Sequence, residues 1–271
     1  MEWFQDYPKH YDIKPDDTGA DEAAFVRKVL RLRKGDAVLD APCGAGRISV
    51  HLAAAGIRVT GLDLTPAYIQ RAKNRFKHEG LDGRFLVADM REIDFVEEFD
   101  GALNWQGSFG FFTDDENLDV VRRYARSLRR GGRLLIDQPS REWILRHYRS
   151  SGRNGDVEFI ARWRPDAQRT DTHFHNIKTG ESWTMTIRHY TPAQYGRLFR
   201  NAGLEIEAMY CDLNGRPYYP GARRIHVLGR KLKGITSYHS VFLAQFAANS
   251  SPPSHALPGA RTPGGNRAAR R

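Results

Sequence analysis

The sequence predicts an α/β protein in which a doubly wound, mostly parallel sheet of seven strands carries an antiparallel β insertion as a lid. Three observations lead to this prediction. Short apolar segments of strand length alternate with segments of helical periodicity over residues 21–137. Between residues 141 and 190, short alternating segments follow one another instead. Residues 191–231 return to a helix followed by two strands. Helices that alternate with strands are typical of doubly wound sheets.

The first part of the chain supplies five strands and the helices between them. The expected strands are residues 36–40, 58–64, 84–89, 99–105 and 133–137. The expected helices are residues 21–35, 46–56, 65–80 and 114–132. Gly56 and Gly80 follow two of these helices, at positions where a left-handed cap is common. The last helix begins with acids and ends with arginines, as the helix dipole favours.

The insertion and the end of the domain follow strand five. Alternating segments over residues 158–163, 170–177 and 182–190 predict antiparallel strands, with a hairpin turn at "NIKTGES". A helix over 191–203 precedes strands at 204–215 and 223–231, which we expect to close one sheet edge as an antiparallel pair. We therefore expect one domain over residues 1–233, with the lid at about 141–190. Residues 234–271 are expected to form a basic, low-complexity, disordered tail.

Composition places the chain among cytoplasmic globular proteins. Its 271 residues can bury a sizeable core, and two cysteines do not make a disulfide framework. The first residues lack the basic and apolar regions of a signal peptide. No apolar run approaches the roughly 20 residues that a membrane span needs. We expect a cytoplasmic protein without a membrane partner, either a monomer or a homodimer.

The net charge of +10 raises the question of a nucleic-acid partner. Residues 231–271 carry six basic residues and no acid, so the preceding 230 residues hold 36 basic and 32 acidic groups and a charge of only +4. A weakly basic body with a basic tail is more often a solubility feature than an RNA-binding groove. An RNA partner stays open as an alternative.

A glycine turn after the first strand predicts a nucleotide site. Gly44 and Gly46 open a helix, and Asp63 ends the second strand 19 residues after Gly44. An acid there grips ribose hydroxyls in nucleotide-binding sheets. The dinucleotide fingerprint is incomplete, because Ser49 replaces its third glycine. Asp40 enters the turn and would repel a pyrophosphate but attract a cation. This pattern favours S-adenosylmethionine (SAM), which carries an ammonium and a sulfonium, over NAD.

The segment "VLDAPCGAGRISVHLAAAGIRVTGLDLTPAYIQRA" resembles the first two motifs of the class I SAM-dependent methyltransferases. Residues 88–92, "FDGALNWQGSFGFF" and "LRRGGRLLID" resemble their later motifs. The resemblance runs from about residue 10 to 230 and implies a Rossmann-like methyltransferase fold. Within the class, the chain is most similar to small-molecule N- and O-methyltransferases, including the sugar-amine type, with a β lid after strand five.

The resemblance implies a role for each cofactor-binding position. It implies that the methionine end of SAM is lined by Asp40 and by the backbone of Ala41, Cys43, Gly44 and Gly46. Arg47 either reaches the methionine carboxylate or is an ordinary helix arginine. Asp63 and Leu64 serve the ribose and adenine, Asp89 and Met90 the adenine edge and face, and Asn104 and Trp105 the sulfonium end.

The acceptor side is less sharply specified. Gln106, Ser108 and Phe109 follow strand four and are expected to shape the acceptor pocket, although Phe109 suits the core equally well. His189, Tyr190 and Tyr11 are the candidate catalytic residues, with burial as the alternative for each. His173 and His175 share one strand face. We expect them at the substrate or on a polar lid face, and we expect no metal.

The sequence thus predicts an enzyme that transfers the methyl group of SAM to nitrogen or oxygen of a small molecule. Two absences argue against a DNA-base substrate: "NWQG" replaces the Asn-Pro-Pro-aromatic motif, and no cysteine follows strand four. An RNA-modifying methyltransferase, a non-catalytic SAM-binding protein and a dehydrogenase remain the alternatives.

Overall fold

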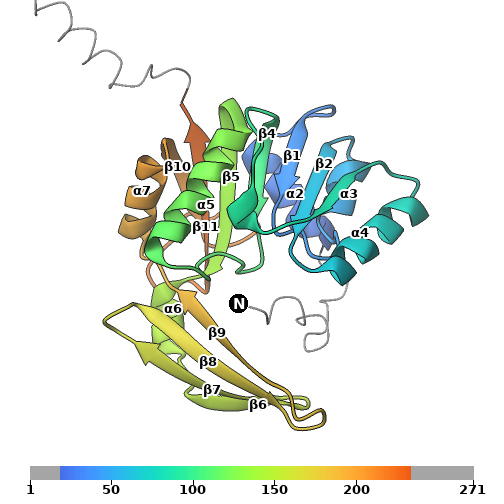
Figure 1. Ribbon diagram of the computed structural model, residues 1–271. Coiled ribbons are helices and arrows are strands. Elements are labelled where there is room, and N and C mark those ends of the chain that lie inside the picture. Colours follow the sequence, from blue (N-terminus) through green and yellow to red (C-terminus); the bar gives the residue numbers. More distant parts are fainter. Residues whose placement is uncertain (1–18, 233–271) are drawn as a thin grey trace, which may run out of the picture. The chain divides into compact units, whose positions relative to one another are not determined.

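The computed structural model describes residues 19–232, and these form two sheets with their helices (Figure 1). The tail predicted over 234–271 and the candidate Tyr11 lie outside the described residues. The seven strands of the main sheet are β1 (Ala37–Asp40), β2 (Arg58–Asp63), β3 (Arg84–Val87), β4 (Phe99–Asn104), β5 (Leu128–Pro139), β10 (Leu204–Tyr210) and β11 (Arg224–Lys231). The helices around it are α2 (Gly19–Leu30), α3 (Ser49–Ala54), α4 (Pro66–His78), α5 (Asp114–Ser127) and α7 (Pro192–Asn201), with a short 3₁₀ turn, η2 (Met90–Glu92).

The strand order is β10-β11-β5-β4-β1-β2-β3. The neighbouring strands from β5 to β3 pair in parallel, whereas β11 runs antiparallel to both β5 and β10. The order reverses between β1 and β4, and open α/β sheets bind ligands at the carboxyl ends of the strands at such a point. The predicted fold class, including the antiparallel closing pair, is confirmed.

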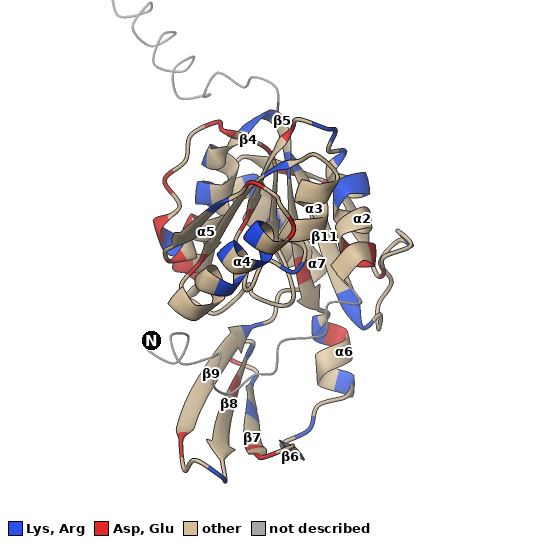
Figure 2. Ribbon diagram, turned by 90° about the vertical axis from the view of Figure 1, so that its right-hand side faces the viewer, with Lys and Arg blue, Asp and Glu red and all other residues tan. Residues whose placement is uncertain are grey.

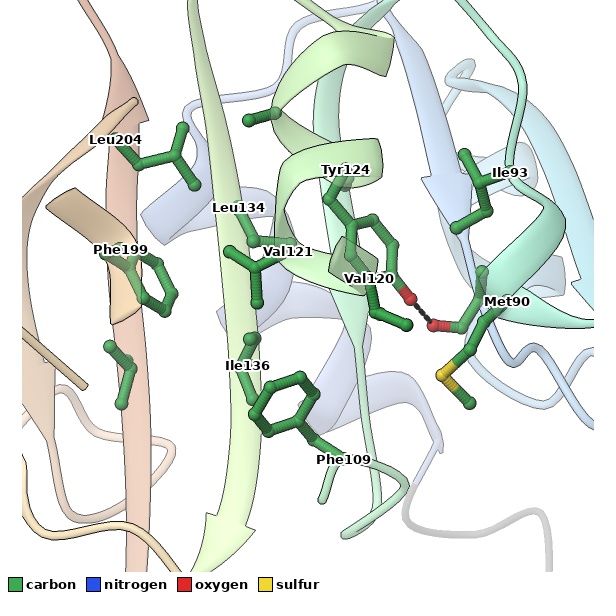
Figure 3. Packing of buried hydrophobic residues seen from close by; sticks show 14 of the residues in the cluster. Met90, Ile93, Phe109, Val120, Val121, Tyr124, Leu134, Ile136, Phe199 and Leu204 are labelled. Atoms are coloured by element: carbon green, nitrogen blue, oxygen red, sulfur yellow. Dashed lines mark hydrogen bonds between the residues drawn. The ribbon is translucent and has the colours of Figure 1, made fainter. Parts of the chain in front are cut away.

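Side chains alternate along each strand. Both faces of the sheet therefore carry apolar residues, and helices cover both faces. Leu134 and Ile136 of β5 pack with α5 and α7, whereas Leu135 packs with the layer that includes α2, α3 and α4. Figure 3 shows Val121 and Tyr124 of α5 directed at the sheet. Two helix layers on one sheet make the doubly wound arrangement that the strand and helix alternation predicted.

Helix α5 ends earlier than the sequence pattern indicated. The helix was expected to continue to residue 132, but it stops at Ser127, and Leu128 already pairs with Phe99 of β4. Leu128 is fully buried and extended (ψ 140°). Burial of this leucine in the sheet therefore overrides the helical propensity of the arginines that follow it.

The lid consists of a second, antiparallel sheet and a helix that leads into it. Its strands are β6 (Ser151–Asn154), β7 (Val157–Arg164), β8 (Arg169–Asn176) and β9 (Ser182–Arg188), paired in that order. The expected hairpin turn joins β8 to β9. The helix α6 (Arg141–Arg146) was not predicted, because six residues are too few to show a period. In Figure 1 the lid sheet lies beyond the arrowhead of β5, on the carboxyl side of the main sheet.

A glycine joins the lid to the loop after β4. The Gly110 carbonyl accepts a hydrogen bond from the Arg188 amide (2.8 Å), and Gly110 has φ +93°. A Cβ at this position would lie 2.5 Å from the Arg188 carbonyl oxygen. No residue other than glycine fits this approach without displacement of one backbone.

We therefore expect Gly110→Ala to destabilise the protein through this clash. Gly155 is the matched control, since its φ is also positive (+57°) but an added Cβ would meet no atom of the described residues within 4 Å. Overpacking costs on the order of 1–3 kcal/mol, so Gly110→Ala should lower the free energy of unfolding by about 1 kcal/mol more than Gly155→Ala. Urea denaturation measures the difference. Equal losses for the two variants would show that the contact is not tight.

Among the described residues, no helix is long and apolar enough to cross a membrane.

Candidate functional site

A cavity of about 550 Å³ lies at the carboxyl ends of the parallel strands and extends to the lid. This volume is in the range of small-molecule sites. Its wall includes residues from the loops after β1, β2, β3 and β4 and from the end of β9. The sequence-predicted site residues in this wall are Asp40, Cys43, Gly44, Arg47, Asp63, Leu64, Asp89, Met90, Trp105, Gln106, Ser108 and His189.

Asp63 ties the glycine turn to the loop after β2. One carboxylate oxygen accepts the Gly44 amide (2.9 Å), and the other accepts the Thr65 amide (2.8 Å). Gly46 has φ +73°, and a Cβ there would approach the Ala72 side chain of α4 to 3.1 Å. Gly44 thus faces the cavity, whereas Gly46 lets α4 pack beneath the turn and is not part of the cavity wall.

Asp40 is a buried carboxylate at the end of β1. The hydroxyl of Ser49 donates a hydrogen bond to it (2.6 Å), so the serine that replaces the third fingerprint glycine has a structural partner. Burial, with a smaller contribution from the nearby Asp63, raises the pKa of Asp40 to about 7 despite this hydrogen bond. Burial also raises the pKa of Asp63, opposed by the amides of Thr65 and Gly44.

The two carboxylates indicate which class of ligand the glycine turn can bind. A pyrophosphate beside two buried acids would add like charge and favour their protonation. An ammonium or sulfonium would stabilise the ionised carboxylates instead. The residues present therefore fit the methionine end of SAM better than they fit a dinucleotide.

Glu22 of α2 holds three of the neighbouring side chains together. It is 7% exposed, and its carboxylate accepts hydrogen bonds from the Trp105 indole (3.0 Å) and from the side-chain amide of Gln106 (2.8 Å). It also forms an ion pair with Arg47. Arg47 is thus a buried residue rather than an exposed helix arginine. Sequence reasoning missed Glu22, although its spacing from Val26 and Val29 places it on the buried face of α2.

Asp89 and Met90 lie where the third strand ends. The Asp89 carboxylate caps η2 through the Arg91 amide (2.8 Å) and also pairs with the Arg91 guanidinium (2.6 Å). Met90 is 8% exposed and belongs to the cavity wall. Both are available to a nucleoside, although Asp89 already has Arg91 as a partner.

Two other predicted cofactor residues lie outside the cavity wall. The Ala41 amide donates to Leu103 (3.1 Å), and its carbonyl accepts the Tyr124 hydroxyl, as Figure 3 shows. Asn104 is fully buried, and its amide nitrogen donates to Tyr124 (3.3 Å). These groups support the turn from behind.

Some of the acceptor-side candidates belong to the cavity wall and others lie outside it. Gln106 has φ +62° and belongs to the wall with Ser108, but Phe109 is buried in the core against Tyr190 and Tyr195. Tyr190 lies outside the wall, and burial raises its pKa. Its position favours packing over catalysis.

The lid histidines His173 and His175 lie outside the cavity wall and bond across the lid sheet. Their imidazoles contact the hydroxyls of Thr184 (3.1 Å) and Ser182 (2.9 Å). Within residues 19–232 no three side chains of metal-ligating type gather at one point. His173 and His175 therefore lie on the lid sheet and not at the cavity where the sequence placed them as possible substrate-binding residues.

His189 does reach the cavity, where the lid returns to the main domain. It is 6% exposed, and its Nε2 lies 2.9 Å from the Thr170 hydroxyl. Burial, reinforced by the charges of Arg188 and Arg141, lowers the pKa of His189 to about 4. The imidazole is therefore neutral near pH 7 and only a weak base.

Cys43 is present in the wall as a thiol rather than a thiolate. Burial and the two adjacent aspartates raise its pKa. A nucleophilic role of this cysteine is therefore disfavoured.

Several wall residues have no motif in the sequence. Asp137 of β5 is not part of the wall, but it accepts hydrogen bonds from the backbone N–H of Gln106 (2.9 Å) and from the guanidinium of Arg224. Although burial opposes ionisation, Arg224 holds the pKa of Asp137 below its usual value. Other wall residues that the sequence did not predict include Tyr68, Arg91, Gln138, Ile144, Met185, Ile187, Arg223 and Arg224.

Comparisons with known proteins agree with this geometry. Residues 38–132 match the family described as "Methyltransferase domain". An uncharacterized protein of Mycobacterium tuberculosis is 35% identical over 104 residues, which is 38% of this chain and 37% of the relative. The chain thus matches little more than a third of that relative's length. The ubiquinone biosynthesis O-methyltransferase of Xanthomonas euvesicatoria is 27% identical over 213 residues, with 75% of each chain covered.

Solved structures share the fold over most of the chain. The CcbJ methyltransferase from Streptomyces caelestis has a TM-score of 0.69 at 17% identity, with 85% of this chain and 96% of that chain covered. The sugar N-methyltransferase KedS8 from Streptoalloteichus has a TM-score of 0.58 at 22% identity, with 81% and 89% covered.

The sheet order, the acid-flanked glycine turn and the family match lead to one assignment. Residues 38–132 are a methyltransferase domain, and the described chain has the Rossmann-like fold of SAM-dependent methyltransferases.

Proposed function

We propose that the protein transfers the methyl group of SAM to a nitrogen or oxygen atom of a small molecule held between the main sheet and the lid. One observation carries the proposal. A single cavity is lined both by the strand ends around Asp40 and Asp63 and by the lid residues Met185 and Ile187. A cofactor at the strand ends and an acceptor under the lid would therefore share one cavity.

When bound, SAM supplies a methyl group that is already activated by its sulfonium. The chain's own residues then mainly orient the two reactants, and such proximity can supply about 7 kcal/mol or more. We expect Asp40 and Arg47, both in the cavity wall, to bind the charged methionine end. Trp105 and Gln106 follow β4 and belong to the same cavity wall.

Whether the acceptor end of the cavity holds a base determines which nucleophiles can be methylated there. A neutral amine needs only a position in line with the methyl group, whereas a hydroxyl also benefits from a base. His189, with a pKa of about 4, accepts a proton poorly near pH 7. The site therefore suits an amine or an acidic hydroxyl. The named sugar N-methyltransferase and the O-methyltransferase are compatible with either outcome.

The experiment is equilibrium dialysis of the protein against SAM and against NAD, followed by methyl-transfer assays with pools of small amines and phenols and with total RNA. We expect SAM to bind, NAD not to bind, and the mass of one small molecule to rise by one methyl group. Tighter binding of NAD would favour a dehydrogenase. Methylation of RNA alone would indicate an RNA-modifying enzyme, and SAM binding without any transfer would indicate a non-catalytic SAM-binding protein.

We also expect the lid to select the acceptor and to contribute little to SAM binding. Met185 and Ile187 of β9 belong to the cavity wall, whereas Thr184 lies on the opposite face of that strand. Met185→Ala with Ile187→Ala should lower kcat/KM for the acceptor roughly fivefold, or about 1 kcal/mol. SAM affinity should stay within about threefold, and Thr184→Ala is the control that should change neither.

Exchange of residues 141–190 for the lid of a related methyltransferase extends this test. We expect a changed range of acceptors at nearly unchanged SAM affinity. A folded chimera that binds SAM and still methylates only the original acceptor would show that the lid is not the selector.

A further inference from the structure

Charge is unevenly distributed along the cavity. Its carboxylates stand at the carboxyl ends of the first three strands: Asp40 and Asp63 end β1 and β2, and Asp89 follows β3. At the other end, among the described wall residues, the ionisable groups are Arg223, Arg224 and His189, and no carboxylate accompanies them. His189 is neutral near pH 7, since its pKa is about 4. The end away from the nucleoside side is therefore cationic.

Three arginines meet where β5 leads into α6 beside the start of β11. We call Arg141, Arg223 and Arg224 the arginine junction. The Ser140 amide donates to the Arg223 carbonyl (3.0 Å), so the backbones of α6 and β11 are adjacent at this point. Arg224 is paired in register with Pro139 at the end of β5. The fold thus brings together residues more than 80 positions apart in the sequence.

Only one of these three charges is balanced within the described residues. Arg224 forms an ion pair with buried Asp137. The Arg223 guanidinium lies over the Trp143 ring (5.6 Å) and has no ion pair among residues 19–232. Arg141 lies over Trp163 (5.7 Å), and its Nε is buried without a hydrogen-bond partner in that same part of the chain. A buried donor without a partner is uncommon in folded proteins and calls for an explanation.

Nearby carboxylates do not supply the missing partners. Glu142 of α6 accepts a hydrogen bond from Tyr218 (2.8 Å), and Asp114 pairs with Arg169 and Arg188. Figure 2 shows charges of both signs on α6. The Arg141 guanidinium lies over the Trp163 ring (5.7 Å), and that ring lies 6.0 Å from the His189 imidazole, so Arg141 is close to a residue of the cavity wall. Guanidinium groups bind carboxylates and phosphates through paired hydrogen bonds.

We propose that the acceptor carries a carboxylate or phosphate group, which Arg223 binds at the lid end of the cavity with Arg141 as the second cation. This inference rests on the proposed function, because it names the substrate class of the same cavity. The apolar body of the acceptor contacts Ile144, Met185, Ile187 and Phe111, which line the same end. The anionic group thereby fixes which end of the acceptor points toward the methyl donor.

The test compares anionic probes with a neutral analogue of the same shape. Benzoate, phenyl phosphate and benzamide are titrated calorimetrically into the protein, both free and saturated with S-adenosylhomocysteine. We expect at least one anion to bind at least tenfold more tightly than benzamide, and the preferred anion identifies carboxylate or phosphate as the group recognised. In Arg223→Gln and in the double variant with Arg141→Gln, this preference should fall at least fivefold.

The matched control is Arg162→Gln, which removes an exposed arginine of the lid that is not part of the cavity wall. It should leave the anion preference unchanged, and all variants should bind S-adenosylhomocysteine within twofold of the parent protein. Equal affinities for the anions and benzamide, or a preference that persists in the double variant, would overturn the proposal. If the parent protein does not bind S-adenosylhomocysteine at all, the proposed function is contradicted. The titrations of the free protein would still show whether the anion site exists.

Discussion

Asp63→Ala is expected to weaken SAM binding by about 1.5–3 kcal/mol, or roughly 10- to 150-fold. The carboxylate stands at the end of β2 in the cavity wall, where the resemblance to SAM-dependent methyltransferases implies that the ribose binds. It also accepts the amides of Gly44 and Thr65. The substitution therefore removes a ligand contact and leaves two backbone donors without their partner. Calorimetry with SAM and with S-adenosylhomocysteine measures the loss.

Asp63→Asn is the matched variant, because it keeps the shape and one acceptor oxygen while it removes the charge. Its affinity should lie between those of the parent protein and Asp63→Ala. A folded Asp63→Ala protein with unchanged affinity for both ligands would remove Asp63 from the site. A loss confined to thermal stability would assign the residue to the turn alone.

The affinity for SAM should fall as the pH is lowered from 7.0 to 5.5. Burial raises the pKa of Asp40 to about 7 in the free protein, and a cationic ligand favours the ionised carboxylate. Below that pKa, binding must first remove a proton, so the apparent Kd rises with acidity. With a free-state pKa of about 7, the expected rise is about 15-fold over this interval if the bound carboxylate stays ionised.

The amino group of the ligand does not obscure this effect, because α-amino groups titrate near pH 8. His189 stays neutral over most of the interval, since its pKa is about 4. Asp40→Asn should bind SAM weakly with a nearly flat pH profile. A parent protein whose Kd is the same at both pH values would show that Asp40 does not face the cation.

The main sheet and the glycine turn could be predicted because their signals are local. Gly44, Gly46 and Asp63 occur at fixed distances around a helix between two apolar strands. The alternation of strands and helices predicts parallel strands, whose carboxyl ends meet at one edge of the sheet. The same local information predicted the lid hairpin and the antiparallel closing pair.

What the sequence could not predict depends on packing between distant segments. Alternation places His173 and His175 on one face of β8 but does not say whether that face meets the cavity. Leu128 begins β5 only because a neighbouring strand is there to pair with it. The surroundings of Arg141 and Arg223 likewise depend on the meeting of β5, α6 and β11.

The placement of polar groups behind the cavity wall was the least predictable feature. Glu22 has the spacing of a buried helix position, yet an acid in a surface helix is normally taken as solvated. Its three partners belong to segments 25 to 84 residues away. Only the folded chain brings them together.

A crystal structure of the protein with S-adenosylhomocysteine tests the central claim most directly. We predict that the homocysteine end lies against Asp40 and Arg47, that the ribose hydroxyls bind Asp63, and that the adenine lies beside Met90 and Asp89. The sulfur should then face the part of the cavity that leads to Met185 and His189. A nucleoside bound elsewhere, or bound with its adenine at the Asp40 end, would contradict the account.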